Sequence, residues 1–544
     1  MPESALQLDA QDNVIVALTP LAAGATVSFG RGTCLVAETI PPKHKMTLVD
    51  LAPGDVIRMY GMVVGEALTS IPRGGLITTQ NIRHRIGAYT TARQPTSSAL
   101  PDASAWATRT FMGFHRADGL VGTRNYWIVL PLVFCENRNV DRMREALEEE
   151  LGYGKARNAW RSHVRDLVQH KTSGNGHKAA DAAPMQPERF FPNLDGIRFL
   201  THQLGCGGTR QDAQALCGLL AGYIHHPNVA GATVLSLGCQ NAQAGMLLDE
   251  LRARDPAMTK PVLVFDQQSS GSESVLMTRA LDQTFAALVE ANRATRSPAP
   301  LSALTVGLQC GGSDGFSGIS ANPTVGYLSD LLVGVGGTTM LSEFPELHGV
   351  EQELINRCAT DELAERFSNL MQTYAARAKA VHSGFDFNPS PGNIRDGLIT
   401  DAIKSAGAAR KGGVSPIRGV IDYPEYVTAR GLNLQCTPGN DVESVTAQVG
   451  AGSNIVLFTT GLGTPTGNPI APVVKISTNS TLAGRMADII DFDAGGIVTG
   501  ETTIPECAAK LLELSIEVAS GGRLTKAELN DQSDFIPWKR GVSL

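Results

Sequence analysis

The sequence of 544 residues lacks an uninterrupted apolar run of about 18 residues, so no membrane-spanning helix is expected. It also lacks an excess of positive charge. The formal net charge of −7 provides no basic footprint for nucleic acid or for an anionic membrane surface. The first residues, MPESALQLDAQDN, contain acids where a secretory signal carries cations, and we therefore expect a cytoplasmic protein.

The nine cysteines have neither the spacing of a disulfide framework nor that of a zinc ribbon. They are scattered through a long chain and not spaced as a disulfide framework, which favours a reducing compartment. None of them forms a CxxC pair, which argues against a zinc ribbon. Each thiol taken singly is more often a small buried hydrophobe than a ligand.

Glycine, in contrast, is abundant, with 57 residues, while only 18% of the residues are charged. This composition is typical of globular α/β proteins with many tight loops around ligands. The length predicts roughly two to four domains.

The amino-terminal part of the chain has a different pattern from the rest. Residues 1–84 alternate short apolar runs with turn signals and contain no long amphipathic pattern, which predicts an all-β module. Residues 85–107 are rich in Ser, Thr, Ala and Pro, and we predict a flexible linker there.

From residue 108 onward, β-branched apolar runs alternate with helical patterns. This alternation predicts an α/β fold with mainly parallel, Rossmann- or flavodoxin-like sheets covered by helices. We divide the region into domains 108–300 and 301–544. A polar stretch at about 155–190 is predicted to be an insertion in the first of them.

Three cysteines follow apolar strands at equivalent points: Cys206 in FLTHQLGCGGT, Cys239 in VLSLGCQNA and Cys310 in VGLQCGGSD. In open α/β sheets, ligands bind outside the carboxyl ends of the strands. Three thiolates brought together by the fold would suit iron, as a mononuclear centre or as an iron–sulfur cluster. Convergence of the three thiols is the assumption behind this prediction.

Several polar residues lie in loops that suit a small polar ligand. The Pro-restricted loop NPSPGN holds two asparagines rigidly, and rigid amides suit a polyol. The run TTGLGTPTG offers hydroxyls and backbone amides for a carboxylate or phosphate, yet it lacks the ending of a Walker loop, which disfavours a nucleotide. Lys475 lies within the apolar strand VVKIST, where a lysine needs a partner or a task.

Further motifs resemble, in order along nearly the whole chain, the altronate and galactarate dehydratase family. They are GFHRADGLVGTRNYW, THQLGCGG, SLGCQ, QCGGSDGFSGISANP, TTMLSEFPELHG, NPSPGN, GLNLQCTPGND, FTTGLGTPTGNPIAPVVKISTN and WKRGVSL. The resemblance implies an amino-terminal SAF (β-clip) domain and a homodimer. It also implies a carbon–oxygen hydro-lyase that converts a hexonate or hexarate into a 2-dehydro-3-deoxy sugar acid. The implied cofactor is iron(II) or another divalent metal such as manganese.

The carboxyl-terminal half is more similar to altronate than to galactarate dehydratase, so D-altronate is the predicted substrate. Galactarate dehydratase and sulfolactate sulfo-lyase are the alternatives, and a non-catalytic sugar-acid sensor is a further one. Some positions depart from the family pattern, among them Gln240 and Leu462, where the family usually has Glu and Arg. These departures remove charges that would serve a metal, a base or a carboxylate.

Dehydration removes the proton beside the carboxylate and expels the β-hydroxyl group, and a metal assists both steps as a Lewis acid. We predict Cys206, Cys239 and Cys310 as metal ligands, and His202, Lys475 or Asp314 as the base. The predicted substrate-binding residues are Gln203, Gln240, Ser313, Asn322, Asn388, Ser390, Asn393, Thr459, Thr460, Thr464, His44, Lys45 and Arg124.

Overall fold

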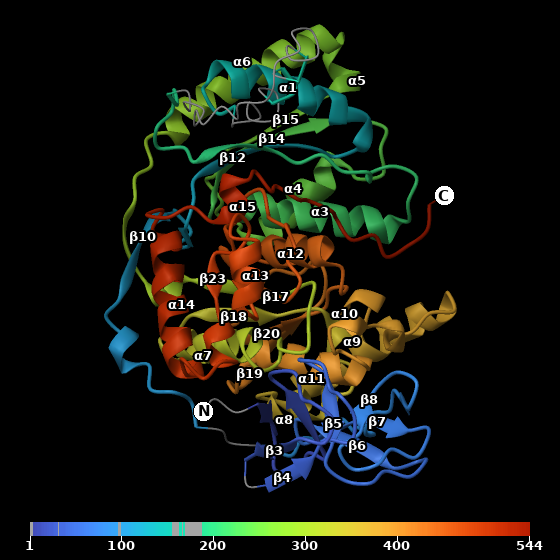
Figure 1. The fold of residues 1–544 in the computed structure, drawn as a ribbon. Helices are drawn as coiled ribbons and strands as arrows, with labels where there is room; N and C mark the ends of the chain where they lie inside the picture. Colours follow the sequence, from blue (N-terminus) through green and yellow to red (C-terminus); the bar gives the residue numbers. More distant parts are fainter. Residues whose placement is uncertain are drawn as a thin grey trace.

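The protein is described from a computed structural model, whose described residues are 4–30, 32–95, 99–154, 163–165, 167–168 and 188–543. The predicted insertion at 155–190 lies almost entirely outside them. In Figure 1 the amino-terminal β module lies at the bottom, the carboxyl-terminal α/β region in the middle and the other α/β region at the top. No helix of the described residues is long and apolar enough to cross a membrane.

The amino-terminal module is built from short strands, as predicted. They form an antiparallel sheet in the order β1-β2-β5-β8, a second sheet in the order β6-β7-β9 and the hairpin β3-β4. Strand β3 alternates exposed and buried side chains, as a strand with one face on a core does. The strands are β1 (Ala5–Leu6), β2 (Val14–Ala17), β3 (Thr26–Phe29), β4 (Gly32–Leu35), β5 (Lys45–Thr47), β6 (Val56–Met59), β7 (Met62–Ala67), β8 (Leu76–Ile77) and β9 (Ile82–Arg83).

The second region centres on a parallel sheet in the order β13-β12-β14-β15. The chain enters and leaves this region through the strands of a small sheet in the order β11-β10-β16. The elements are β10 (Thr110–His115), β11 (Val121–Gly122), β12 (Tyr126–Pro131), α1 (Asn137–Glu150), β13 (Gly196–Phe199), α3 (Arg210–His225), β14 (Val229–Ser236), α4 (Ala244–Arg254), β15 (Val262–Asp266), α5 (Gln267–Ser270), α6 (Glu273–Ala291) and β16 (Ser297–Pro300).

Helices cover both faces of this four-stranded sheet. Trp127 and Val129 of β12 are buried with residues of α1 and α6, whereas Ile128 and Leu130 are buried with residues of α3 and α4. Successive side chains of a strand point to opposite faces, which is why a strand that is buried on both faces reads as a continuous apolar run.

The carboxyl-terminal region holds a seven-stranded parallel sheet in the order β19-β20-β18-β17-β21-β22-β23. The elements are β17 (Thr305–Cys310), α7 (Ala321–Gly334), β18 (Thr338–Leu341), the 3-10 helix η4 (Phe344–Leu347), α8 (Glu351–Arg357), α9 (Asp361–Ala380), α10 (Pro391–Arg395), α11 (Asp401–Ala409), η6 (Arg410–Gly412), β19 (Ile417–Ile421), β20 (Gly431–Gln435), α12 (Asp441–Gly450), β21 (Ile455–Thr460), β22 (Val473–Ser477), α13 (Ser480–Arg485), β23 (Phe492–Asp493), α14 (Ile504–Ala519) and α15 (Lys526–Leu529).

The two α/β regions share a core, because α3 of one packs directly on α12 of the other. A side-chain carbon at Gly222 of α3 would lie 2.0 Å from the carbonyl oxygen of Gly450 in α12. Glycine at this position therefore lets the two helices approach more closely than any other residue would. In Figure 1 both helices lie between the two sheets.

The segment between the amino-terminal module and β10 is held in place more firmly than a flexible linker. The backbone amides of Thr90 and Gln94 donate hydrogen bonds of 2.9 Å to the side chains of Gln352 and Asn356 on α8. Arg93 also forms an ion pair with an aspartate of α9. Partners on another part of the chain anchor this stretch, and its composition gave no sign of them.

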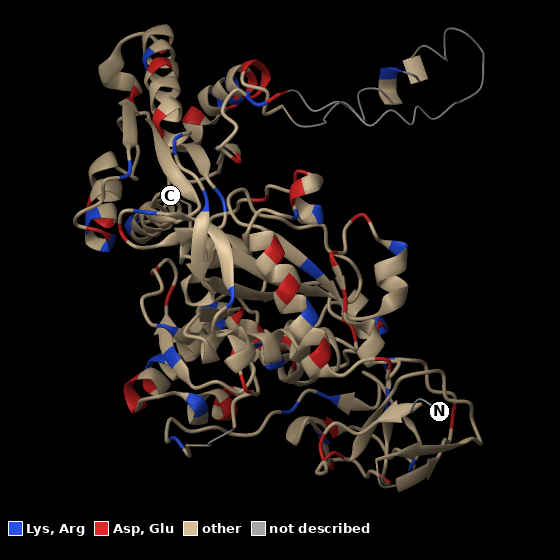
Figure 2. Cartoon of the chain, turned by 90° about the vertical axis from the view of Figure 1, so that its left-hand side faces the viewer, with Lys and Arg blue, Asp and Glu red and all other residues tan. Residues whose placement is uncertain are grey.

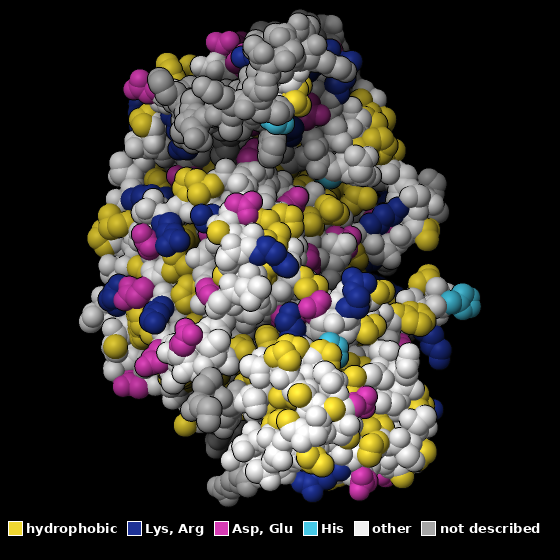
Figure 3. Space-filling model, in the orientation of Figure 1, with side chains coloured by type: hydrophobic (Ala, Val, Ile, Leu, Met, Phe, Trp, Pro, Cys, Tyr) yellow, Lys and Arg dark blue, Asp and Glu magenta, His cyan; other side chains and the backbone are white. Residues whose placement is uncertain are grey.

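Acidic and basic side chains are mixed over the surface. In Figure 2 the positions of acidic and basic residues are interspersed along the chain, and Figure 3 shows hydrophobic, acidic and basic groups side by side on the face that it draws. The face drawn in Figure 3 thus carries no large patch of a single charge.

Candidate active site

The carboxyl edge of the seven-stranded sheet has the topology of a ligand site. The chain runs from β17 to β18 on one side and later returns to β21 on the other side of β17. Ligands of open α/β sheets bind at such a reversal of strand order. The two loops touch there, since the amide of Gly311 donates to Thr459 O at 3.0 Å and that of Gly461 donates to Gly312 O at 3.0 Å.

A charged cluster, formed by Cys310, Glu343, Glu346, Lys404 and Lys411, lies at this edge. Lys411 Nζ is 2.7 Å from Cys310 Sγ and 2.6 Å from Glu343 Oε2. The Cys310 thiol also donates to Glu346 Oε2 at 3.3 Å. At most 3% of the surface of Cys310, Glu343, Glu346 and Lys411 is exposed, so these charges interact in a poorly screened environment.

Glu343 is held at the end of β18 by several contacts. Its backbone is left-handed, with φ of 66°, which is uncommon for a residue with a side chain. The hydroxyl of Thr437 accepts its amide hydrogen at 2.9 Å, and Gln309 donates to Glu343 Oε1 at 2.6 Å. Strained backbone of this kind persists where the surroundings fix it and is frequent at functional sites.

Glu346 and Lys404 form the second ion pair of the charged cluster. Lys404 Nζ lies 2.6 Å from Glu346 Oε1, and it also donates to Asn388 Oδ1 at 3.1 Å. In the sequence, Lys404 lies in the helical pattern ITDAIKSAG, which is typical of an ordinary surface helix. The fold buries it, with 10% of its side chain exposed, because the loop after β18 covers α11.

Two carboxyl groups beside these lysines titrate near neutrality. Burial raises the pKa of Glu343 to about 7, against the opposing effect of Lys411. Burial, helped by Glu346, raises the pKa of Asp441 to about 7. Groups with such pKa values can give and take protons at physiological pH.

Burial, followed by the charge of Glu343, raises the pKa of the Cys310 thiol well above its usual value. A thiol with a raised pKa is a poor nucleophile. The charged cluster combines acid–base carboxyl groups with two ammonium groups that can hold an anionic substrate.

Three family profiles match successive parts of the chain. Residues 3–85 match the altronate/galactarate dehydratase SAF domain, residues 113–292 the second domain of D-galactarate dehydratase/altronate hydrolase, and residues 301–543 the carboxyl-terminal domain of D-galactarate/altronate dehydratase. Among curated proteins, altronate dehydratase of Escherichia coli (strain K12) is 33% identical over 99% of both chains. Altronate dehydratase of Bacillus subtilis (strain 168) is 32% identical over the full length of both.

The chain belongs to the altronate/galactarate dehydratase family. A further member, the galactarate dehydratase (L-threo-forming) of Escherichia coli (strain K12), is 34% identical over 94% of this chain and 92% of its own. These matches confirm the predicted family and the predicted amino-terminal SAF domain.

The SAF domain of this family member contacts the edge that carries the charged cluster. Lys43 Nζ lies 3.0 Å from Asp314 Oδ2 and 2.8 Å from Asp396 Oδ1. The hydroxyl of Thr478 also donates to Asp314, at 3.0 Å. Asp314, one of the predicted bases, is thus a fully buried anchor for the SAF domain, because its oxygens are already bonded.

The two residues of the SAF domain that were predicted to bind substrate, His44 and Lys45, lie next to Lys43. Lys45 Nζ donates to Gly397 O at 2.5 Å, and burial lowers its pKa to about 7. His44 bonds through Nδ1 to Pro42 O at 3.1 Å, and burial lowers its pKa. These contacts favour a docking role, and a substrate-binding role stays a prediction.

Two residues predicted to bind a polyol, Thr459 near the end of β21 and Asn322 at the start of α7, form a hydrogen bond with each other. The Thr459 hydroxyl donates to Asn322 Oδ1 at 2.6 Å, and Asn322 donates in turn to Gly407 O at 2.9 Å. Thr460 accepts the amide hydrogen of Gly463 at 2.9 Å. These groups hold the loops in place, as do many buried polar groups.

Thr464 and the NPSPGN loop also lie near the charged cluster. A side-chain carbon at Gly312, whose φ is 57°, would lie 2.9 Å from the Thr464 hydroxyl, so this turn needs glycine. Ser390 and Asn393 form a capping box at the start of α10, and Asn393 donates to Ser313 O at 2.7 Å. Of this predicted set, Asn388 contacts the charged cluster directly.

His202, another predicted base, is in the other α/β region and has a structural role. Its Nε2 donates to Pro131 O at 2.8 Å, and its Nδ1 accepts the amide hydrogen of Leu204 at 3.1 Å. Burial lowers its pKa to about 4, so the ring stays neutral. The neighbouring Gln203 is exposed.

The three cysteines do not gather into one ligand group among the described residues. Cys206 and Cys239 are exposed and follow β13 and β14, whereas Cys310 is buried and follows β17. These strands belong to two different sheets, so equivalent positions along the chain do not bring the thiols together. Gln240 bonds within its own turn, to the Gly238 amide at 2.6 Å and to Ser236 Oγ at 2.7 Å.

Lys475 and Arg124 already have partners. Lys475 donates to the carbonyl oxygen of Thr466, and burial lowers its pKa to about 8, against the opposing effect of Asp491. Its lowered pKa keeps it a candidate base. Arg124 is buried in a two-pronged ion pair with Glu528, at 2.7 and 3.0 Å, and this pair joins the two α/β regions.

The metal that the family resemblance implies can be tested against the donor atoms. Cys310, Glu343 and Glu346 offer ligand atoms within 4.8 Å of one another. Lys411 and Lys404 already lie within hydrogen-bonding distance of these atoms, and a single cysteine does not suit an iron–sulfur cluster. This donor set therefore fits an ion-pair network and does not fit a metal.

Sequence reasoning missed five members of the site: Glu343, Glu346, Lys404, Lys411 and Asp441. A usable signal was present, because Glu343 follows the apolar run TTML just as Cys310 follows LTVGL. An acid directly behind a buried strand lies at the ligand edge of a parallel sheet.

Proposed function

We propose that the chain is a hydro-lyase that converts D-altronate into 2-dehydro-3-deoxy-D-gluconate and water. The observation that carries the proposal is the charged cluster at the strand-order reversal, in a chain that is similar over its full length to two altronate dehydratases. Dehydration needs a base, an acid and a cationic environment for an anion, and the charged cluster with Asp441 offers all three.

The reaction breaks the bond between C2 and its hydrogen, and this electron pair forms the C2–C3 double bond. The bond from C3 to its hydroxyl group breaks, and the departing oxygen takes a proton and leaves as water. The enol then becomes the 2-oxo acid when C3 gains a proton. Hydroxide is a poor leaving group, so a positioned acid accelerates the step by about 10²–10⁴-fold.

We assign the base to Asp441 and the acid to Glu343. Asp441 begins α12 and is only half-buried, so a substrate can reach it. Glu343 is fully buried beside Lys411, whose ammonium group would stabilise the carboxylate that remains after Glu343 has given its proton away. Lys404 would bind the substrate carboxylate and stabilise the enolate.

Turnover of a panel of sugar acids tests this proposal. Purified protein, with iron(II) or manganese added under anaerobic conditions, is assayed for 2-oxo acid formation from D-altronate, D-gluconate, galactarate and sulfolactate. We expect the highest kcat/KM with D-altronate. A preference for galactarate or sulfolactate would contradict D-altronate as the substrate but would still support a lyase activity. Tight binding of a hexonate without any turnover would instead indicate a sugar-acid sensor.

We also propose that the protein is a homodimer, as the family resemblance implies. Light scattering on the eluted protein would measure its mass in solution. A mass of one chain at micromolar concentration would contradict this proposal.

A further inference from the structure

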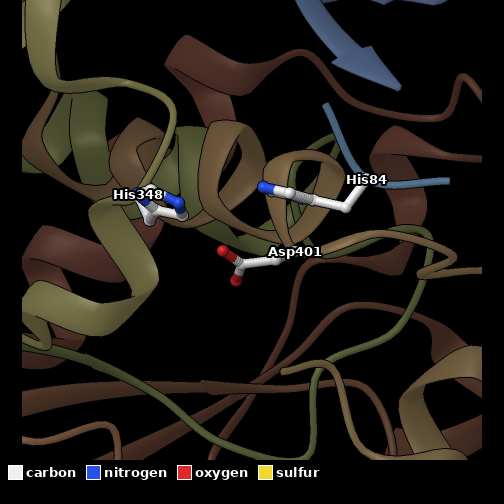
Figure 4. Close-up of side chains that lie close together, drawn as sticks. All are labelled: His84, His348 and Asp401. Atoms are coloured by element: carbon white, nitrogen blue, oxygen red, sulfur yellow. The ribbon is translucent and has the colours of Figure 1, made fainter. Parts of the chain in front are cut away.

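A second group of metal-ligating side chains lies where the SAF domain ends. His84 follows β9, His348 follows η4, and Asp401 is the first residue of α11. One ligand atom from each lies within 4.8 Å of the other two. Figure 4 shows the two imidazole rings facing each other beside the Asp401 carboxylate. Three distant parts of the chain thus meet around one small space.

The carboxylate of this group has no hydrogen-bond partner within the described residues. Asp401 is completely buried, and neither of its side-chain oxygens receives a hydrogen bond. His84 Nδ1 is also buried and unpaired. Burying a polar group without a partner is costly, and for a charged group the cost is larger. A cation bound between the three side chains would remove this cost.

His348 is oriented as a metal ligand commonly is. Its Nδ1 lies 3.0 Å from Glu351 Oε1, and the amide of Gly349 donates to Glu351 Oε2 at 2.7 Å. A carboxylate that accepts the Nδ1 hydrogen of an imidazole fixes the tautomer and leaves the lone pair on Nε2 for a metal. Glu351 itself is buried, with 2% exposed.

The charges around this group also favour a cation. Burial raises the pKa of Asp401 well above its usual value, the carboxylates of Glu346, Asp386 and Glu351 raise it further, and the ammonium of Lys404 opposes them. Lys404 is already paired with Glu346 at 2.6 Å. The group therefore lacks the resident ammonium that occupies the charged cluster.

The remaining candidate group in the described part of the chain is weaker. Asp118, His225 and Asp255 also offer ligand atoms within 4.8 Å, but Asp118 is exposed and Asp255 is half-buried. Water can satisfy exposed carboxylates without any ion.

We propose that His84, His348 and Asp401 bind one divalent first-row transition metal ion. Two imidazoles and one carboxylate suit iron(II), manganese, cobalt or zinc, whereas magnesium and calcium prefer all-oxygen sites. Three protein ligands leave coordination positions open for water or another small molecule. The ion would also tie the end of the SAF domain to the carboxyl-terminal region.

The proposal rests on this geometry and not on the proposed dehydratase activity, so it is tested without substrate. Protein stripped with a chelator is titrated with cobalt(II), which is followed by its visible absorption and by calorimetry. We expect one equivalent bound by the wild type, with a spectrum of nitrogen and oxygen ligands. Magnesium should give no comparable heat.

Variants assign the ligands. D401N, H84Q and H348Q should each weaken cobalt binding by more than about 100-fold, and E351Q by about 10–100-fold. The matched controls C310S and D118N, each in one of the other candidate groups, should keep the affinity and spectrum of the wild type. Unchanged binding in D401N, or loss of binding in C310S alone, would overturn the proposal.

Thermal unfolding separates a lost ligand from a damaged fold. Cobalt should raise the melting temperature of the wild type by a few degrees and leave that of D401N unchanged, because a ligand stabilises only the state that binds it. In the presence of chelator, D401N should melt at or above the temperature of the wild type, because the amide replaces a buried carboxyl group whose oxygens have no hydrogen-bond partner among the described residues. Absence of any cobalt-induced shift in the wild type would also overturn the proposal.

Discussion

The two parallel sheets carry the same sequence signature at their carboxyl edges, but the edges have different surroundings. In the four-stranded sheet, Cys206 and Cys239 follow apolar strands and point into exposed turns. In the seven-stranded sheet, Cys310 follows an apolar strand in the same way and is buried against Glu343 and Lys411. The difference shows that the neighbouring loops, and not the cysteine, decide which edge carries chemistry.

Charge burial underlies this contrast. An exposed turn leaves its polar groups in contact with water. A buried edge forces charges to pair and shifts their pKa values, as it does for Glu343 and Asp441. Groups with perturbed pKa values are candidates for a functional site. Four predictions test the contrast, in order of decreasing expected effect.

The largest effect is expected from removing the acid–base carboxyl groups of the buried edge. E343Q and D441N should each lower kcat by about 10²–10⁴-fold, which is the usual contribution of general acid–base catalysis. Formation of the 2-oxo acid from D-altronate measures this. Far-UV circular dichroism checks the fold, and D249N, which changes an exposed carboxylate on α4, is the matched carboxyl control. Full activity in both variants would contradict the assignment of Asp441 as the base and Glu343 as the acid.

The second effect concerns stability. K411M should lower the free energy of unfolding by about 3–5 kcal/mol, because it leaves Glu343 buried without its partner. Urea unfolding followed by fluorescence measures the change. R252M, which breaks the exposed pair between Arg252 and Asp249 on α4, should leave the unfolding midpoint almost unchanged. Equal midpoints for the two variants would contradict the contrast between the edges.

The third effect is a pH dependence. Glu343 and Asp441 have folded-state pKa values of about 7, above their unfolded values, so the folded state binds their protons more tightly. Their contribution to stability is therefore fully present below the unfolded pKa values and is lost as the pH rises through about 7. Urea midpoints at several pH values should fall over this range, and the fall should be smaller in E343Q.

The same two pKa values predict a bell-shaped profile of kcat/KM with its maximum near neutral pH. The ionised base Asp441 is lost on the acid side, and the protonated acid Glu343 is lost on the alkaline side. Activity that is flat across this range would contradict the two roles.

The smallest effect is expected at the exposed edge. C206S and C239S should each keep kcat within about twofold of the wild type, because surface changes away from a site act weakly. C310S should lose far more, since its thiol fills the space between Glu346 and Lys411. Steady-state kinetics with D-altronate measure all three. A large loss of kcat in C239S would instead support the predicted role of Cys239 as a metal ligand.

Part of this site was predictable from local pattern. The apolar run before Cys310 and the glycines after it place that residue at the end of a buried strand, where the structure has it. The structure places the Pro-restricted loop beside the charged cluster, since Asn388 contacts Lys404. The expectation for His202 found no such support, because both of its ring nitrogens bond to nearby backbone.

By itself, the sequence determined the alternation of strands and helices, the all-β amino-terminal domain and the family, because local periodicity and ordered motifs carry this information. The tertiary structure alone decided which strand ends meet. The edge of a parallel sheet follows the spatial order β18-β17-β21, which differs from the chain order. Lys411 therefore reaches Cys310 and Glu343 across 101 and 68 positions of sequence, and the charged cluster arises from these contacts.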